Sequence, residues 1–403
     1  MIRLNSSLRM RSLDESLALV RSVAGEYGIT RVTNTTALDR IGIPVFASIR
    51  PNAVPGSLCV SAGKGLLPAE AEMGAYMEAI ELASCEFGRS GIGFAPVTVE
   101  RMLDGYDARV TMADFAPLLG RRFDSNELIA CTPGEEVLSG ETVLVPSELV
   151  FSPFDDNPFA TKFGSSSVGL ASGNNLLEAS VHGLAELIEH DIASFGFVRD
   201  ESCLVRLDSA PMPIKRLRQL CEDAGFSLYL RHTPNAFGLP YFRATLFDNT
   251  DDAPLAVCAG YGLHPIRSIA AVRAMTEAAQ SRLTAIHGGR DDLTKRLEHW
   301  PQSARKQEIE AISALRTKES NADNAVDFAN IVDHEQHVTS LETAWEYMVD
   351  VLREQNLSQV VRICLSKASD PFQVVRIIVP GLEAFSPEHM RIGRRLHDYI
   401  MSL

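Results

Sequence analysis

Polar and apolar positions recur with helical spacing between residues 174 and 191, where the chain reads NNLLEASVHGLAELIEHD. At about 100° per residue, four polar side chains fall within roughly 80° of one another, and the apolar side chains face the other way. The polar stripe consists of Glu178, His182, Glu186 and Glu189, and the apolar face of Val181, Leu184, Leu187 and Ile188. The pattern predicts a helix that buries one face and can bind through the other. Taken alone, such glutamates more often mark the solvated face of an amphipathic helix.

A second acidic helix is predicted after a glycine-flanked lysine. Residues 61–86 read SAGKGLLPAEAEMGAYMEAIELASCE, in which Lys64 precedes a helical pattern with Glu78 and Glu81 three residues apart, and therefore side by side. The first helix likewise follows a glycine- and serine-rich stretch, residues 163–175, whose backbone N–H groups would hold an anion. Carboxylates repel an anion unless a hard cation such as Mg²⁺ joins them. The two segments together favour a metal-bridged anion site over two solvated faces.

A third helix with several polar side chains is predicted at residues 264–293, ending at the pair Gly288 and Gly289. Its polar positions include spacings of three and four, so that several of them would face one site. These positions are Arg273, Glu277, Gln280, Ser281 and Arg282. Ion pairing along the helix surface, such as Arg273 with Glu277, is the alternative interpretation.

The rest of the pattern mixes helices with short strands bounded by glycine and proline. Further helices are predicted at 14–27, 214–224 and 341–355, and strands within 30–50, 97–100, 128–131, 142–146, 203–207, 226–232, 239–248, 254–263, 360–366 and 374–381. The strands between 226 and 263 suggest an antiparallel sheet. The polar stretch 294–337 is interpreted as a helical excursion or lid with a mobile loop.

No long flexible linker divides the chain, and this favours one mixed α/β (α+β) unit over separable domains. Within that unit we expect an N-terminal helical segment at 1–30, a core at 31–293, a helical excursion at 294–356, and closing strands with a tail at 357–403.

Composition and charge narrow the function classes. The chain has 403 residues, 45% hydrophobic content and 22% charged residues, which is ordinary for a globular protein with a substantial core. A net charge of −14 without clustered Lys or Arg argues against a nucleic-acid partner. No apolar stretch is long enough for a membrane span, and the start carries charges throughout, so a cytoplasmic location is expected. The 7 scattered cysteines form no CxxC pair and suggest reduced thiols.

Two phosphate-binding motifs are excluded. Around Lys64, the spacing from Gly56 to Gly63 is too long for a P-loop, and Gly65 stands where Ser or Thr must bind Mg²⁺. The stretch GYGLH at 260–264 lacks the third glycine of a dinucleotide fingerprint.

From about Arg31 to Glu383, the chain resembles the YcaO family. The matching landmarks, in order, are RVTNTTALDRIGIPVFASIRPN, SAGKG followed by EAIE, SGNNLLEASVHGLAELIEHD, RAMTEAAQSRLTAIHGGRDDL and VVRIIVPGLE. The resemblance implies a YcaO fold, in which sheets and helices surround a carboxylate-lined ATP site. It also implies an ATP-dependent enzyme that phosphorylates backbone amides of ribosomally made peptides.

The resemblance also assigns residues to the cofactors ATP and Mg²⁺. Glu78 and Glu81 would bind Mg²⁺, and Glu178, Glu186 and Glu189 would complete a cage around metal and phosphate. Asn174 would contact the nucleotide, while Ser61 and Lys64, in the glycine-rich turn, and Arg282, in the EAAQSR element, would also contact ATP. No catalytic residue is assigned.

The chain departs from the family pattern at three places. His190 stands where many members have Arg, which removes a permanent cation with bidentate reach to phosphate. Gly74 replaces a common serine before EAIE. Azoline-forming members tend to end in a proline-rich PxPxP tail, whereas this chain ends RRLHDYIMSL.

The absent proline tail favours thioamide formation with an external sulfur source over azoline formation at Cys, Ser or Thr. The expected partners are a precursor peptide or protein substrate and a TfuA-like sulfur-transfer protein or a peptide-clamp protein, and a homodimer stays open. A non-catalytic nucleotide-binding accessory or scaffold is the alternative from another class. His190 and Gly74 favour the scaffold, and the intact glutamates weigh against it.

Overall fold

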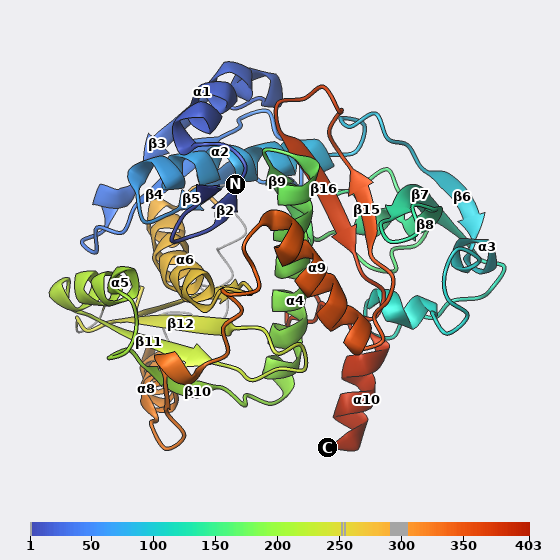
Figure 1. Ribbon diagram of the computed structural model, residues 1–403. Coiled ribbons are helices and arrows are strands. Elements are labelled where there is room, and N and C mark those ends of the chain that lie inside the picture. Colours follow the sequence, from blue (N-terminus) through green and yellow to red (C-terminus); the bar gives the residue numbers. More distant parts are fainter. Residues whose placement is uncertain (1, 251–252, 254, 291–304) are drawn as a thin grey trace.

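In the computed structural model, the described residues are 2–250, 253, 255–290 and 305–403, and they form helices packed around four β-sheets (Figure 1). The described helices are α1 (Leu13–Val23), α2 (Pro68–Cys85), α3 (Val99–Leu103), α4 (Leu176–Val198), α5 (Met212–Asp223), α6 (Arg267–His287), α8 (Arg305–Ser320), α9 (Leu341–Glu354) and α10 (Arg394–Ser402). None of them combines the length and apolar character needed to cross a membrane.

The strands are short and mostly antiparallel. They are β1 (Ile2–Arg3), β2 (Leu8–Arg9), β3 (Arg31–Asn34), β4 (Val45–Ile49), β5 (Val60–Lys64), β6 (Ala95–Thr98), β7 (Leu128–Glu136), β8 (Thr142–Pro146), β9 (Leu170–Gly173), β10 (Cys203–Arg206), β11 (Phe226–His232), β12 (Tyr241–Asp248), β13 (Val257–Leu263), β14 (Val326–Asp327), β15 (Val361–Cys364) and β16 (Gln373–Ile378). Strands β1 and β2 pair with each other as an N-terminal hairpin.

A five-stranded sheet in the order β13-β12-β11-β10-β14 carries α6 on one face. The helix lies directly on the backbone of β13, because a Cβ at Gly262 would be 2.1 Å from the Ala270 carbonyl oxygen. Pairing from β11 to β13 is antiparallel, as predicted, and β14 pairs in parallel with β10. A core of buried side chains from α5, α6 and this sheet includes Phe226 and Phe242.

The three-stranded sheet β3-β4-β5 supports α2 in the same way. A Cβ at Gly63 in β5 would lie 2.1 Å from the Ala75 backbone nitrogen, so only glycine permits this approach. Ala71, Ala75 and Ala79 are fully buried small residues on the facing side of α2. Close packing of strand and helix brings Lys64 and the glutamates of α2 to one side of the sheet.

The third layer is a six-stranded sheet in the order β6-β7-β15-β16-β9, with β8 added to β7. Helix α4 packs on β9 and β16 and also contacts α9. Asn175 caps α4, since its side chain accepts a 2.8 Å hydrogen bond from the Glu178 backbone N–H. The predicted apolar face is buried, with Leu184 and Ile188 fully inaccessible.

Several expected boundaries differ from the structure. The glycine- and serine-rich stretch 163–175 contains strand β9, and only the first half of 97–100 belongs to β6, because Val99 begins α3. The sequence also gave no indication of the hairpin β1–β2 or of α10. Both short elements depend on contacts with distant segments, which local patterning does not record.

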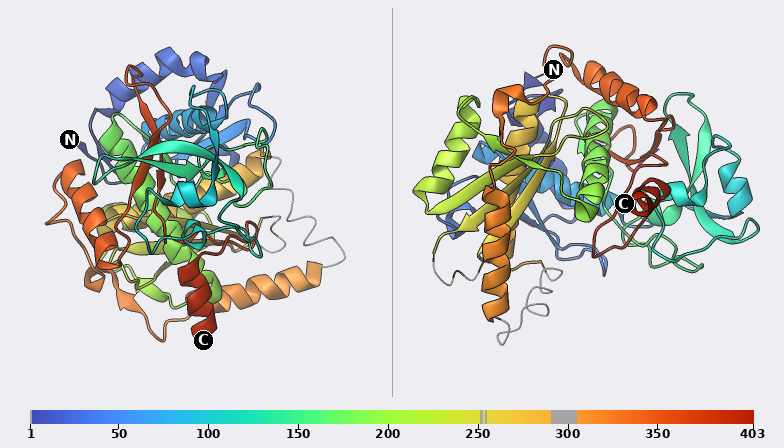
Figure 2. Two further views of the ribbon diagram at one scale, coloured as in Figure 1. Left: turned by 90° about the vertical axis from the view of Figure 1, so that its right-hand side faces the viewer. Right: turned by 90° about the horizontal axis from the view of Figure 1, so that it is seen from below.

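The polar stretch 294–337 is partly outside the described residues, since 294–304 are not described. Its described part contains α8 and β14, and α8 projects beside the five-stranded sheet (Figure 2). None of the described residues 305–356 lines the main cavity, and the interpretation of 294–337 as a lid stays a prediction. The subdivision of the chain into segments of one unit stays a prediction.

Candidate functional site

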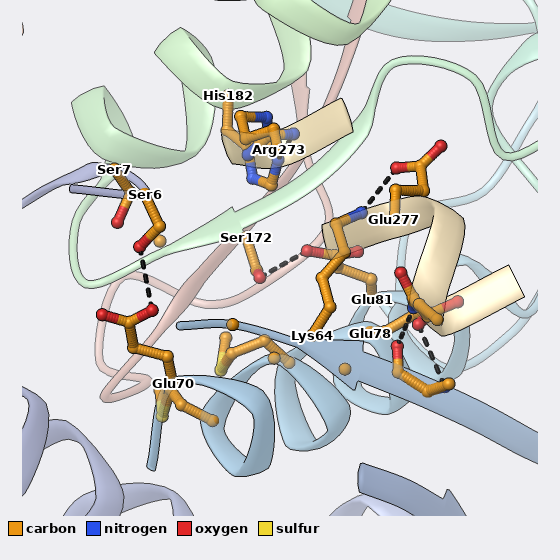
Figure 3. Close-up of a pocket in the computed structure, with 18 of the residues that line it drawn as sticks. Ser6, Ser7, Lys64, Glu70, Glu78, Glu81, Ser172, His182, Arg273 and Glu277 are labelled. Carbon is orange, nitrogen blue, oxygen red and sulfur yellow. Dashed lines mark hydrogen bonds and ion pairs between the residues drawn. The ribbon is translucent and has the colours of Figure 1, made fainter. Parts of the chain in front are cut away.

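A cavity of about 560 Å³ opens between α2, α4 and α6, with β5, β9 and side chains from residues 2–16 completing its wall. Acidic side chains from all three helices line this cavity. Figure 3 shows those of α2 and α6, with the basic Lys64 and Arg273 among them. Of the residues assigned to ATP and Mg²⁺, the cavity collects Lys64, Glu78, Glu81, Asn174, Glu178, Glu186 and Glu189. Carboxylates from two distant stretches of sequence therefore share one cleft.

The α2 glutamates are held by backbone and hydroxyl donors of two edge strands. Glu78 accepts a 3.1 Å hydrogen bond from the Ala62 N–H, and Glu81 accepts a 2.5 Å hydrogen bond from the Ser172 hydroxyl. Burial raises the pKa of Glu78. Burial, with the Glu78 charge adding to it, raises the pKa of Glu81 to about 7. The negative charge of both carboxylates is therefore not fully balanced by nearby positive charges.

The α4 glutamates have the same electrostatic character. Burial, followed by the charges of Glu81 and Glu189, raises the pKa of Glu186 well above its usual value. Burial and the Glu277 charge raise the pKa of Glu189 to about 7. His190 lies 3.8 Å from Glu186, but burial lowers the pKa of this imidazole to about 4 and leaves it neutral. The histidine therefore adds no positive charge to the group.

These carboxylates fit Mg²⁺ only in combination with an anionic ligand. Among the described residues, no three acidic, cysteine or histidine side chains converge closely enough to hold a metal by themselves. Mg²⁺ in nucleotide sites keeps waters and takes one or two carboxylates together with phosphate oxygens. Raised pKa values indicate that the acidic group gains free energy from added cations. The donor set fits magnesium bound between protein and phosphate, and the assignment of the individual carboxylates to the cage around metal and phosphate stays a prediction.

Glu178 differs from the other acids because protein donors already surround it. It is 2% exposed and accepts hydrogen bonds from Arg9 Nη1 at 2.9 Å and from the Met10 N–H at 2.9 Å. The Asn174 amide donates to both carboxylate oxygens, at 3.1 and 3.0 Å, and itself accepts from the Ser16 hydroxyl at 2.9 Å. Sequence reasoning missed this N-terminal contribution, for which the only signal was the run of charges in RMRS.

The cations of the cavity are paired with polar groups across it. Lys64 Nζ lies 2.5 Å from Glu277, and Arg273 donates to His182 Nε2 at 3.1 Å (Figure 3). Burial alone would raise the pKa of Glu277, but the charge and hydrogen bond of Lys64, the Tyr261 N–H and the Arg273 charge together outweigh it and lower the pKa. Arg273, Glu277, Gln280 and Ser281 all line the cavity, which matches the expectation that several polar positions of this helix face one site.

Two assigned residues lie elsewhere. Ser61 is 2% exposed and outside the cavity lining, although its neighbours Ala62 and Gly63 belong to it. Arg282 pairs with Asp39 at 2.8 Å and with Asp248 at 3.1 Å. Its position on α6 is about 140° around the helix from Glu277, so its side chain leaves on the opposite side. The structure therefore does not bring Arg282 to the proposed nucleotide site.

The fold and the acidic cavity thus define a class of proteins that bind a magnesium-complexed anion. A family model described as "YcaO cyclodehydratase, ATP- and Mg²⁺-binding" matches residues 62–383, and the chain belongs to the YcaO family. The predicted family, the mixed α+β fold and the cofactors ATP and Mg²⁺ are confirmed. The individual roles of the site residues stay predictions.

Relatives and solved structures agree with this assignment. A Rhizobium leguminosarum bv. trifolii protein named for its place in the tfuA 3′ region is 33% identical over 94% of this chain and 90% of its own. The structure of YcaO from Methanopyrus kandleri, bound with AMPPCP and Mg²⁺, covers 96% of both chains at 23% identity with a TM-score of 0.75. A heterocyclase in complex with substrate and cofactor covers 98% of this chain and 55% of its own, at 18% identity and a TM-score of 0.73.

Proposed function

We propose that this protein activates backbone amides of a ribosomally made peptide or protein by ATP-dependent O-phosphorylation, so that an external sulfur donor can convert them to thioamides. The observation that carries the proposal is that carboxylates of α2 and α4, whose raised pKa values show too little compensating positive charge, converge on one cavity that also holds Lys64 and Arg273. Carboxylates that take Mg²⁺ and cations that take phosphate are both required for a magnesium nucleotide.

The chain's own residues have distinct tasks in this chemistry. MgATP supplies, when bound, the γ-phosphoryl group that turns an amide oxygen into a leaving group. Glu78, Glu81, Glu186 and Glu189 would hold the magnesium ions. Lys64 and Arg273 would neutralise and orient the phosphates. A sulfur nucleophile at the sulfide level, from the external donor, would then add to the amide carbon, the C–O bond would break, and the oxygen would leave in inorganic phosphate.

The cysteines of the chain support an external sulfur source. No cysteine is among the described residues that line the cavity. Burial raises the pKa of Cys131 and of Cys221 to about 12, which keeps both thiols protonated and poorly nucleophilic. Cys59 is exposed but also lies outside the cavity lining. A sulfur carrier would therefore be a separate protein, and the tfuA-linked name of the Rhizobium relative makes a TfuA-like partner the first choice.

Azoline formation is the second candidate, favoured by the family description as cyclodehydratase and by the likeness to a heterocyclase. The two reactions share the activated amide and differ only in the nucleophile, which is a Cys, Ser or Thr side chain of the substrate in azoline formation. A peptide-clamp protein would then be the expected partner. A non-catalytic scaffold would bind nucleotide without turning it over.

The deciding experiment combines the purified chain with MgATP, a candidate precursor peptide, a TfuA-like partner and sulfide, and follows peptide mass and ADP release. Exchange of oxygen for sulfur, with one ADP for each modified amide, is the expected result. Glu186→Gln should abolish both signals, and Glu354→Gln, a change at an exposed site in the last turn of α9, should leave them intact. Loss of one water from the peptide would establish azoline formation instead. Nucleotide binding without ADP release under any condition would favour the scaffold.

A further inference from the structure

Two segments of the chain have the same order of elements. The first runs from α1 to α2 through β3, β4 and β5, and the second runs from α5 to α6 through β11, β12 and β13. In each segment three antiparallel strands stand between two helices, the helices contact each other, and the second helix packs on the third strand. Residues 13–85 and 212–287, here called the first and the second repeat, therefore share one architecture (Figure 1).

The repeats also agree in the contact between the third strand and the second helix. A Cβ at Gly63 would lie 2.2 Å from the Ala71 carbonyl oxygen, and a Cβ at Gly262 would lie 2.1 Å from the Ala270 carbonyl oxygen. Glycine and carbonyl are separated by the same number of residues in both repeats. Fully buried alanines occupy equivalent positions of the two helices, namely Ala71, Ala75 and Ala79 in α2 and Ala270, Ala274 and Ala278 in α6. Each helix therefore approaches the backbone of its strand in the same way.

This equivalence makes Glu277 of α6 the counterpart of Glu78 of α2. Glu78 accepts a hydrogen bond from the Ala62 N–H and Glu277 accepts one from the Tyr261 N–H, both at 3.1 Å, and each donor lies 16 positions before its glutamate. Both glutamates line the cavity. Their electrostatic states differ, however. Burial raises the pKa of Glu78, whereas at Glu277 burial is outweighed, chiefly by Lys64, and the pKa is lowered.

Two differences in sequence between the repeats explain these electrostatic states. Lys64 at the end of β5 corresponds to the buried Leu263 at the end of β13, and Glu81 corresponds to Gln280. The Lys64 side chain crosses to the second repeat, where its Nζ lies 2.5 Å from Glu277 (Figure 3). The second repeat thus has one carboxylate, already paired with an ammonium group, where the first repeat has two carboxylates whose charge is not fully balanced.

We propose that the Lys64 ammonium group takes, at Glu277, the place that a divalent cation takes at Glu78, and that it thereby confines the metal ions of the cavity to the side of α2 and α4. An ammonium group has three donors, so Lys64 can bond to Glu277 and still donate to a phosphate oxygen. It joins a carboxylate to a phosphate as magnesium does. Without this partner, the Glu277 carboxylate would keep an unbalanced charge and would take up a cation from solution. This inference rests on the nucleotide-binding part of the proposed function.

The test counts the Mn²⁺ ions bound to the full chain at saturating AMPPCP, by electron paramagnetic resonance, because Mn²⁺ prefers the same oxygen ligands as Mg²⁺. Lys64→Met should bind an additional ion compared with wild type. Glu78→Gln should bind Mn²⁺ about tenfold or more weakly, whereas Glu277→Gln should keep the wild-type number of ions and an affinity within about twofold. Lys306→Met is the matched control and should behave as wild type, since Lys306 lies on α8 with 88% of its side chain exposed, outside the cavity lining.

The double variant Lys64→Met with Glu277→Gln locates the additional ion. It should return to the wild-type number, because the carboxylate that takes up the ion is gone. An additional ion that persists in the double variant, a wild-type number in Lys64→Met, or a loss in Glu277→Gln equal to that in Glu78→Gln would overturn the inference. The comparison of the two glutamates leaves Lys64 in place, so it decides the question even if Lys64→Met does not fold. If wild type itself binds no Mn²⁺ with AMPPCP, the proposed function fails, and this outcome is distinguishable from failure of the role of Lys64 alone.

Discussion

Glu81→Gln tests whether the cavity carries excess negative charge in the absence of magnesium. The pKa of Glu81 rises from 4.5 to about 7 through burial, with a further contribution from the Glu78 charge. The folded state therefore keeps a proton that the unfolded state loses between these pH values, and the free energy of unfolding falls as pH rises through this window. Above pH 7 the full destabilisation is present.

The size of the effect follows from the shift. A rise from 4.5 to about 7 corresponds to about 3 kcal/mol, at about 1.4 kcal/mol per pKa unit. Glutamine removes the charge while its Oε1 can still accept the hydrogen bond that the Ser172 hydroxyl donates. At pH 8 without magnesium, the variant should therefore melt about 2–5 °C higher than wild type. At pH 4.5 the two proteins should melt together.

The assay is thermal denaturation of both proteins from pH 4.5 to pH 8, with and without MgATP. Magnesium nucleotide should raise the melting temperature of wild type more than that of Glu81→Gln, because only wild type offers the carboxylate. Glu354→Gln, exposed and remote on α9, serves as the charge-matched control and should follow wild type throughout. A Glu81→Gln protein that melts below wild type at pH 8 without magnesium would refute the electrostatic argument.

Two further changes test the close contact between β5 and α2 and the position of Arg282 outside the cavity. Gly63→Ala would place a Cβ 2.1 Å from the Ala75 nitrogen, and it should lower the free energy of unfolding in urea by about 2 kcal/mol or more. Gly25→Ala, which meets no atom within 4 Å, should change it by less than about 1 kcal/mol, and equal effects would contradict the close strand–helix contact. Arg282→Gln removes the ion pair with the nearly inaccessible side chain of Asp39, while Asp248 keeps its 2.6 Å pair with Arg40, and it should lower stability by about 3 kcal/mol. Its affinity for Mg-AMPPCP should stay within about twofold of wild type, and a loss of about tenfold or more would restore Arg282 to the site.

Local patterning predicted the parts of the site that lie within single helices. The stripe on α4 and the pair on α2 follow from a period of 3.6 residues, and the structure places their carboxylates in one cavity. The same periodicity placed several polar residues of α6 together. Arg282 belongs to the same family motif, EAAQSR, but lies about 140° around the helix from Glu277, and a motif matched as a unit does not separate the two faces.

The sequence predicted the strands less completely than the helices, because some strands depend on pairing with distant segments. Strand β9 is a four-residue element of small side chains, LASG, and its identity as a strand depends on pairing with β16 across the sheet. Strand β14 has two residues and exists only through parallel pairing with β10. Neither segment has an alternating apolar pattern of its own that would indicate a strand.

The amino-acid sequence by itself determined the family, the main helices and the acidic stripes, since each of these is recorded in residues close together along the chain. Tertiary structure alone decided which charges meet. Arg9 and Glu178 are 169 positions apart and come together only after the hairpin and α4 have docked on the same core. Contacts of this kind depend on how several elements close around a cavity, and no local spacing of residues encodes that geometry.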